Sequence, residues 1–511
     1  MDPIKDNPPS TIEEKKDVSH QLPVDVYGVT GSKAAEKDDD IDDSSIQEDE
    51  KQLVRKLDIR IMILLCFCEG VSRWDGSNAL PSAKLMGIME DLNVSEAQYR
   101  WCLTGPFLAF LILSVPINLV LRKSRASLLL GTLVTVWGAI ALITPAVKNF
   151  VGLLITQIIT GACAAANDPV QVYYATLWYR RYETAQRLGW FSIGGGIASS
   201  VRGLILYAAT QIPNTTTIKT WQWMFIILGL PSFICGVLCI LILPDKPETA
   251  KFINNEEKEL AINRLSKEQA YTASQYSWSW KQVISVLLDW KLYCFTLLFL
   301  TDNIVAGGTR LNLPSIIDGM GYWTEQQSVA LAVPPYALGC IMIYPVSWLS
   351  DKFKQRVYFM VVVYLITAAS ILLLMFVPEE IVGLRYFAVC AFRALTLLFS
   401  PIRNSWASGA FSGLTRRAVA LAIFFMGSAA GNAIAGQAYF DPPNYRMGYT
   451  VALCSLAVSI LLSLSLRVVF SRENKRRNQI MQDHRKREHQ ITKYGGPDLV
   501  GDRHPDYRYS L

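Results

Sequence analysis

Long apolar segments recur along the middle of the chain, separated by short polar stretches. Each is close to the roughly 20 residues that a helix needs to cross the hydrocarbon core of a bilayer. We expect them at residues 58–79, 100–121, 126–146, 150–173, 187–209, 221–243, 291–313, 328–349, 356–377, 383–404, 417–438 and 447–469. The first and the seventh are the weakest, because they contain several charged residues. The pattern predicts twelve membrane-spanning segments.

The composition of these segments indicates helices rather than strands. Strands of a membrane barrel would be about ten residues long, with apolar and polar positions alternating. Residues 363–376 and 453–466 instead are uncharged and apolar throughout, apart from scattered serines and threonines. Helices satisfy their own backbone hydrogen bonds in lipid without closing a barrel. We therefore expect an all-α polytopic membrane protein.

A polar connection at residues 244–290 divides the segments into six and six. We expect an N-terminal tail at 1–57, a first six-helix half at 58–243, this linker, a second half at 291–469 and a C-terminal tail at 470–511. Two such halves are typical of secondary transporters, whose substrate site lies near the bilayer midplane between the repeats.

Charge is concentrated at the two ends of the chain. Charged residues make up 18% of the sequence, and 39 of the 92 lie in the two tails. The remainder is far below the roughly one quarter that is usual in soluble domains. The composition excludes a purely soluble and a fully disordered protein, although the acidic N-terminal tail has too little apolar content to fold.

Lysines and arginines in the short loops indicate the orientation, because cytoplasmic loops carry the excess. With the N-terminus inside, the cytoplasmic loops contain Arg122, Lys123, Arg125, Arg180, Arg181, Arg187, Lys352, Lys354, Arg356, Arg416 and Arg417. Both termini are then cytoplasmic. The sequons at Asn93 and Asn214 fall in loops that face outside, so both are candidate glycosylation sites.

Several other kinds of chemistry lack the residues they need. All four histidines lie in the tails, and the sequence has no phosphate-binding G-x-x-x-x-G-K-[ST] loop. The ten cysteines lie within or beside predicted spans and are interpreted as small buried side chains, without the spacing of a zinc site. We therefore expect that the protein is not an enzyme and binds no metal ion or cofactor. We expect a proton gradient to drive its transport.

The net charge of +6 is a topology signal and needs no nucleic-acid partner. We expect a monomer whose partners are the lipid bilayer and a small solute.

Ionisable residues inside spans are costly in lipid and usually mark a transport pathway. They are Glu69, Arg73, Asp75, Asp168, Arg202, Asp302, Arg310 and Arg393. For Arg202 and Arg310 the favoured alternative is a structural charge that reaches the membrane surface.

An arginine in the pathway suits a carboxylate, because its planar fork can bind both oxygens. A desolvated carboxylate can hold the coupling proton. Asp75 and Asp168 are the preferred proton sites, with Glu69 as a further candidate. Arg73 and Arg393 are the preferred anion contacts. Further candidate substrate contacts are Gln157, Asp302, Arg310, Asn404 and Trp406.

Short motifs along residues 55–470 resemble a known family. They are Trp178–Arg181, Leu243–Thr249 (LPDKPET), Glu256–Ala261, Leu313–Ile317, Pro334–Ala337, Trp348–Phe353 with Arg356, Asn404–Ser408 and Pro443–Tyr449. In order and spacing they are similar to the major facilitator superfamily, and within it to the fungal anion:cation symporters related to allantoate, pantothenate and nicotinate permeases.

This resemblance implies a twelve-helix major facilitator fold and proton-coupled uptake of a small organic anion, of carboxylate, vitamin or ureide type, across the plasma membrane. It also makes Asp351, Lys352 and Arg356 a conformational latch at a tight cytoplasmic turn. The alternatives are a metabolite exporter or exchanger of the same fold and a transport-inactive nutrient sensor.

The sequence departs from the family pattern at two places. Gly76 and Ser77 stand where the family commonly has Asp-Arg, and Gln157 and Ala164 replace an arginine and a glutamate. The substrate and the coupling chemistry of the family therefore do not follow directly for this sequence.

Overall fold

The computed structural model describes residues 48–511 apart from short gaps. The gaps are 73–75, 122–124, 180, 214–217, 246, 274–279, 354, 412–413, 441–443, 483–508 and 510–511, and some individual side chains within helices are also outside the description. The chain divides into residues 1–52 and residues 53–511, and all that follows concerns the second unit.

The first group of helices, here called the N-half, runs from residue 58 to residue 242. It consists of η1 (Asp58–Met62), α2 (Ile63–Ser72), α3 (Gly76–Leu85), α4 (Ile88–Asp91), α5 (Glu96–Leu121), α6 (Ala126–Ile143), η2 (Thr144–Ala146), α7 (Phe150–Thr176), α8 (Arg181–Thr210) and α9 (Thr220–Ile242). The first predicted span is thus two helices, α2 and α3, on either side of residues 73–75.

The second group, the C-half, follows a helical linker. The linker holds η3 (Pro247–Thr249), α10 (Asn255–Ala273) and α11 (Trp280–Leu287), and the C-half holds α12 (Trp290–Asp318), α13 (Glu325–Leu331), α14 (Val333–Phe353), α15 (Arg356–Phe376), α16 (Val382–Gly409), α17 (Leu414–Ala438) and α18 (Arg446–Gln482). Helix α18 continues 13 residues beyond the end predicted for the last span, Val469.

The helices confirm the predicted fold class. Within the residues that the structure describes, eight of them are long and apolar enough to cross a membrane, and shorter apolar stretches occur in α7 and α8. The remaining predicted spans coincide with α2 and α3, α5, α7 and α8, in or beside which some residues lie outside the description.

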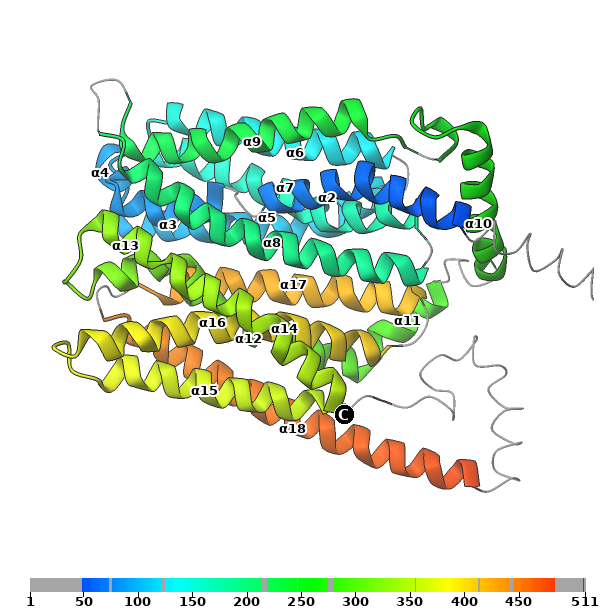
Figure 1. The fold of residues 1–511 in the computed structure, drawn as a ribbon. Helices are drawn as coiled ribbons and strands as arrows, with labels where there is room; N and C mark the ends of the chain where they lie inside the picture. The colour runs from blue at the N-terminus through cyan, green and yellow to red at the C-terminus, as the bar shows by residue number, and fades with distance from the viewer. Residues whose placement is uncertain are drawn as a thin grey trace, which may run out of the picture. The chain divides into compact units, whose positions relative to one another are not determined.

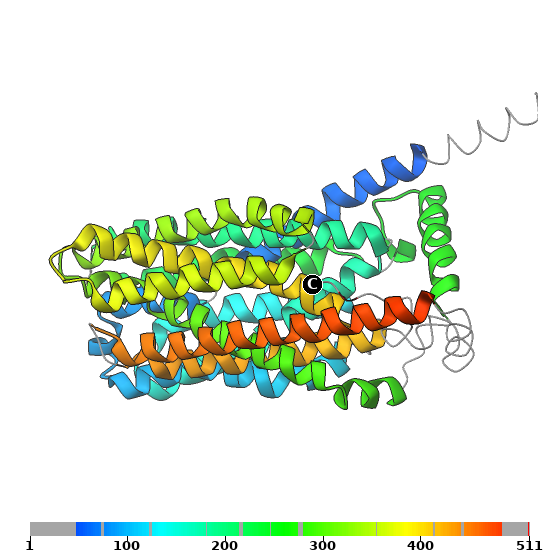
Figure 2. The same ribbon diagram turned by 90° about the horizontal axis from the view of Figure 1, so that it is seen from below.

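Packing within each half is close where glycines face a neighbouring backbone. In the N-half, α5 packs on α7 and α6 on α9, and in the C-half α12 packs on α17 and α14 on α16 (Figures 1 and 2). A Cβ atom added at Gly161 of α7 would lie 2.1 Å from the carbonyl oxygen of Pro106 on α5. A larger side chain there would force these two helices apart.

The halves meet through α5 against α17, α8 against α13 and α14, and α3 against α12. We call the end of the bundle that carries α10 and α11 the linker end, and the opposite end, which carries α4 and α13, the distal end (Figure 1). Hydrogen bonds between the halves lie toward the distal end. Gln437 donates to the Thr104 hydroxyl at 2.9 Å, and Gln326 donates to the carbonyl oxygen of Thr210 at 3.1 Å. The halves are therefore joined at the distal end.

Near the C-terminus, Tyr509 packs against the linker end of the C-half. Its ring stacks on Phe470 of α18 with centroids 4.5 Å apart, and its hydroxyl accepts a hydrogen bond from the Lys291 ammonium of α12 at 3.2 Å. Asn474 holds its backbone at both the N–H and the carbonyl, at 3.0 and 2.8 Å. Tyr509 is therefore an anchor on α12 and α18.

Candidate functional site

Three arginines surround one tyrosine where the two halves meet. We call this group, Arg202, Arg310, Arg393 and Tyr336, the arginine cluster. Arg202 comes from α8 of the N-half, and the others come from α12, α16 and α14 of the C-half. The guanidinium carbon of Arg393 lies 4.5 Å from the centroid of the Tyr336 ring, and that of Arg202 lies 5.6 Å from it. The cluster therefore spans the interface between the two halves.

Burial makes these charges costly. Arg202, Arg393 and Tyr336 are 7%, 4% and 9% exposed. The charges of all three arginines act on the Tyr336 hydroxyl, and Arg202 and Arg393 repel each other. A buried cation is strongly destabilised unless an anion or hydrogen-bond acceptors compensate it.

Arg393 is only partly compensated. It donates to the carbonyl oxygen of Ala306 at 3.4 Å and to the Thr396 hydroxyl at 3.3 Å. Among the described residues, no carboxylate lies within ion-pair distance of Arg393, and its Nε has no hydrogen-bond acceptor. The arrangement favours a bound anion.

Arg310 extends the cluster toward the N-half. Its guanidinium carbon lies 5.2 Å from the ring centroid of Phe107 on α5. The sequence favoured a structural, surface-reaching charge for Arg202 and Arg310. In the structure both arginines lie instead at the interface between the halves. Hydropathy indicates how deep a residue lies along a helix, but it does not indicate which neighbouring helix the side chain faces.

Helix α7 contributes uncharged polar side chains within the N-half. Gln157 and Gln171 are each 1% exposed and stand 14 residues apart, close to four helical turns, so they share one side of α7. The Oε1 atom of Gln157 is buried and has no hydrogen-bond partner among the described residues. Gln157 remains a candidate substrate contact.

Among the three candidate proton sites, Glu69 is the one whose side chain the structure describes. It is 5% exposed and accepts a hydrogen bond from Gln171 at 3.2 Å, which links α2 to α7. Arg73 and Asp75 lie outside the described residues, and Asp168 lies on α7 with its side chain outside the description. Asn167, which is also buried on α7, and Gln171 were not among the predicted site residues. Their uncharged amides do not stand out in a polar stretch of sequence.

Asp302 belongs to a separate network inside the C-half. It is 1% exposed and accepts hydrogen bonds from Tyr364 at 2.9 Å, Ser459 at 3.0 Å and Arg403 at 3.2 Å. These partners come from α15, α18 and α16. In this structure Asp302 is an ion-pair partner of Arg403, and its contact with substrate stays a prediction. Arg403 was missed because it stands at the end of a predicted span, where a basic residue is ordinary.

The two remaining C-half candidates lie further along α16. Trp406 is fully buried, with its ring 5.0 Å from that of Phe295 in the C-half core. Trp406 is therefore packed as a core residue, and its contact with substrate stays a prediction. Asn404 is half-buried and donates to Ser400 one turn earlier at 3.2 Å.

The proposed latch is described in part. Arg356 donates to the carbonyl oxygen of Ser405 at 2.8 Å and so ties the start of α15 to the last turns of α16. Lys352 is exposed, with its ammonium 4.7 Å from the Trp348 ring centroid, and the side chain of Asp351 lies outside the description. In the N-half, Asp58 accepts two hydrogen bonds from Arg187 at 2.7 Å each. That pair was missed, because it joins residues 129 positions apart.

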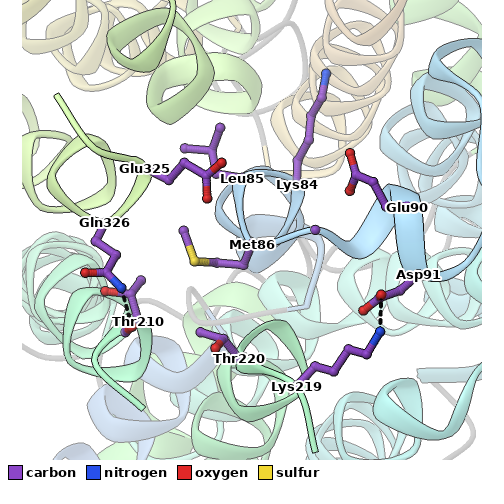
Figure 3. Close-up of a pocket in the computed structure, with 11 residues that line it drawn as sticks. Lys84, Leu85, Met86, Glu90, Asp91, Thr210, Lys219, Thr220, Glu325 and Gln326 are labelled. Carbon is purple, nitrogen blue, oxygen red and sulfur yellow. Dashed lines mark hydrogen bonds and ion pairs between the residues drawn. The ribbon is translucent and has the colours of Figure 1, made fainter. Parts of the chain in front are cut away.

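A separate cavity of about 570 Å³ opens at the distal end (Figure 3). Its walls carry Lys84, Glu90, Asp91 and Lys219 of the N-half with Glu325 and Gln326 of the C-half. Lys219 pairs with Asp91, and Lys84 pairs with Glu96 at 2.8 Å. This mixture of charges does not favour an anion, in contrast to the arginine cluster.

The first sequon lies at the same end of the bundle. Asn93 is exposed, in the turn that follows α4. Asn214 lies outside the described residues.

Comparisons with known proteins agree with this architecture. The family model of the Major Facilitator Superfamily matches residues 65–436. The chain is 29% identical over 480 residues to an uncharacterised transporter of Schizosaccharomyces pombe, covering 93% of this chain and 96% of that protein. It is 28% identical over 484 residues to a high-affinity nicotinic acid transporter of Saccharomyces cerevisiae, covering 93% and 88%.

Solved structures share the fold at low identity. The inward open xylose transporter XylE from E. coli superposes with a TM-score of 0.61 at 13% identity, covering 79% of this chain and 95% of that one. An inward-facing bacterial homologue of the lysosomal transporter Spinster gives 0.59 at 14% identity, covering 79% and 96%. The extent of the family match shows that this chain belongs to the major facilitator superfamily.

Proposed function

We propose that this transporter carries a small organic anion with a carboxylate group, coupled to protons, by alternating access. The observation that carries the proposal is the arginine cluster, which places buried positive charge from both halves around one tyrosine hydroxyl. A carboxylate there would accept bidentate hydrogen bonds from a guanidinium and one more from Tyr336. The similarity to a nicotinic acid transporter, whose substrate is a carboxylic acid, supports the same substrate class.

Glu69 is the proposed proton site. Its carboxylate is buried on α2, a helix that contributes no residue to the arginine cluster, and it accepts a hydrogen bond from the uncharged Gln171. A proton on Glu69 would remove a buried negative charge, and its release would restore that charge, so protonation can bias the packing of α2 against α7. The protonmotive force then drives accumulation.

The proposed orientation puts the linker end and both tails in the cytoplasm. The basic loops and the outward sequon at Asn93 support it, since Asn93 lies at the distal end with α4. The joined distal end then corresponds to a carrier closed to the outside. We propose the plasma membrane as its location.

The test is uptake of labelled vitamins, ureides, amino acids and monocarboxylates in yeast that lack their own permeases. We expect a carboxylate to accumulate and a protonophore to abolish the accumulation. Failure of every anion to accumulate, with normal surface expression, would contradict uptake. Release of a preloaded anion under the same conditions would indicate an exporter instead.

Substitution of Arg393 tests the cluster. Arg393→Gln should lower kcat/KM by about 100-fold, because a charged hydrogen bond to the anion is lost. Arg393→Lys should retain more activity, since it keeps the charge but not the fork. Arg467 of α18, whose guanidinium carbon lies 3.8 Å from the Tyr358 ring centroid, is the matched control. Equal losses in Arg393→Gln and Arg467→Gln would contradict a role for the cluster in binding.

A further inference from the structure

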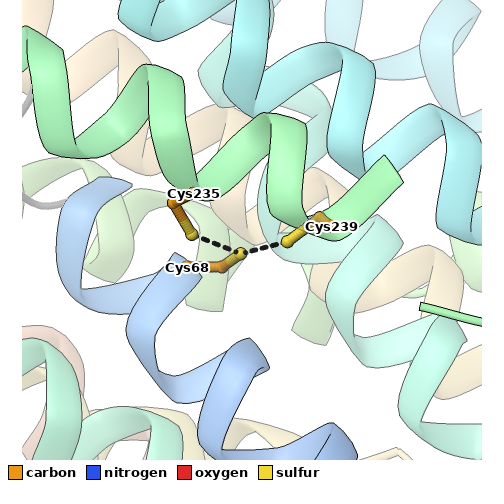
Figure 4. Close-up of side chains that lie close together, drawn as sticks. All are labelled: Cys68, Cys235 and Cys239. Atoms are coloured by element: carbon orange, nitrogen blue, oxygen red, sulfur yellow. Dashed lines mark hydrogen bonds between the residues drawn. The ribbon is translucent and has the colours of Figure 1, made fainter. Parts of the chain in front are cut away.

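Three cysteines that are distant in the sequence meet inside the N-half. The Sγ atom of Cys68 on α2 lies 3.2 Å from that of Cys235 and 3.0 Å from that of Cys239, both on α9 (Figure 4). Cys235 and Cys239 are four residues apart and therefore share one face of their helix. All three sulfurs lie within 4.8 Å of one another, so a single ion could contact all three.

The surroundings of this trithiol group are apolar. All three cysteines are 0% exposed, and they pack in a core that includes Leu65 and Leu130. Among the described residues, the charges that act on Cys68 and Cys239 are those of other thiols of the group, with no lysine or arginine. A ligand that left net charge here would be strongly destabilised.

We propose that Cys68, Cys235 and Cys239 form a binding site for a trivalent thiophilic metalloid, arsenic(III) or antimony(III). Three thiols that lose their protons acquire three negative charges, which one trivalent ion neutralises. Zinc in structural sites takes four ligands in a tetrahedron, and a cuprous ion on three thiolates would leave two negative charges. A neutral pyramidal tris-thiolate meets both the ligand count and the need for zero net charge.

The chemistry is a ligand exchange without oxidation or reduction. Arsenous acid, As(OH)₃, exchanges its three As–O bonds for three As–S bonds. Each thiol proton leaves with one hydroxide as water, so three waters are released and no electrons move. Arsenous acid is neutral, and Cys239 lies three residues before α9 ends at Ile242, about 4.5 Å of helix rise from the linker end. The reagent therefore has a short path from that end.

The trithiol group is separate from the arginine cluster, although Cys68 directly precedes Glu69, the proposed proton site, on α2. The group lies on α2 and α9, whereas the arginine cluster lies on α8, α12, α14 and α16. Its occupancy can be measured on purified protein without any transport.

The experiment adds arsenite to the reduced full-length protein in detergent, removes unbound reagent by gel filtration and measures arsenic per chain. X-ray absorption at the arsenic edge then counts sulfur neighbours. We expect one arsenic per chain with three sulfur neighbours. Cys68→Ala, Cys235→Ala and Cys239→Ala should each weaken binding by about 100-fold, because the third thiol acts at a high effective concentration.

Matched controls are Cys102→Ala and Cys163→Ala, which are also buried cysteines of the N-half. They should bind arsenic like the unmodified protein. Arsenic with oxygen or only two sulfurs as neighbours would overturn the proposal, as would unchanged binding in a properly folded Cys68→Ala protein. Equal loss in the control variants would overturn it as well.

Discussion

Two arginines on one helix show how surroundings decide the role of a residue. Arg393 and Arg403 stand ten residues apart on α16, about 15 Å of helix rise, and both are 4% exposed. Arg403 is neutralised by Asp302 inside the C-half, whereas Arg393 faces Tyr336 and has no described carboxylate within ion-pair distance. The charge of Arg403 is therefore structural, and the charge of Arg393 is available to an anion.

Sequence reasoning found Arg393, Arg310 and Glu69 by one rule, that ionisable residues in a span are costly. It favoured a surface charge for Arg202 and Arg310, and it made Asp302 a candidate substrate contact. The rule registers a charge in a helix but cannot tell whether the fold supplies a partner. Partners such as Arg403 for Asp302 are 101 residues away, and only packing brings them together.

Glu69→Gln tests the proton site at the residue scale. We expect the variant to lose accumulation of the anion against its gradient while it keeps exchange of external for internal anion. A neutral amide mimics the protonated acid, so transport steps that need no proton release continue. The measurement compares net uptake with counterflow in proteoliposomes, with and without an imposed pH gradient.

Gln171→Leu is the companion variant for Glu69→Gln. It removes the hydrogen-bond partner of Glu69 but leaves the carboxylate, and should keep coupling in part. Full pH-driven accumulation by Glu69→Gln would remove Glu69 from the coupling role.

The Asp302 network acts at the scale of helices, since it joins α12 to α15, α16 and α18. Asp302→Asn should destabilise the C-half by about 3 kcal/mol, because it leaves the buried charge of Arg403 unpaired. Asp302→Asn combined with Arg403→Leu should recover part of this loss. Thermal unfolding in detergent measures both, and a double variant less stable than the sum of the singles would contradict the pairing.

Tyr509 connects α12 and α18 at the linker end. Tyr509→Ala should release the C-terminal residues and increase proteolytic cleavage after residue 482, because stacking on Phe470 and the bond from Lys291 are lost. Tyr509→Phe should remain docked more tightly than the alanine variant, since it keeps the stacked ring. Equal cleavage rates in all three proteins would show that the contact does not hold the chain.

Much of the element scale was predictable from the length and composition of the hydrophobic segments. The division of the eighth span into α13 and α14 was not predictable, because its sequence is apolar enough to look continuous. The meeting of Cys68 with Cys235 likewise depends on the packing of α2 against α9 and has no signal in sequence spacing.

At the scale of the whole molecule, the joined distal end must open if access alternates. A Cβ atom added at Gly436 of α17 would lie 2.9 Å from the Thr104 hydroxyl oxygen on α5, so Thr104→Cys with Gly436→Cys is placed to form a disulfide. Oxidation of this double variant should abolish transport, and reduction should restore it. Each single variant, treated in the same way, is the control. Transport that continues in fully cross-linked protein would contradict a cycle that opens this end.

The repulsion between Arg202 and Arg393 has a kinetic consequence, because the two charges belong to opposite halves. When the halves close without an anion, like charges are brought together, and when an anion is present they share a counter-ion. The empty carrier should therefore reorient more slowly than the loaded one. We expect anion on the far side of the membrane to accelerate uptake several-fold, a trans-stimulation measurable with preloaded vesicles. Arg202→Gln should reduce that acceleration, so a pair of like charges would set which step limits the transport cycle.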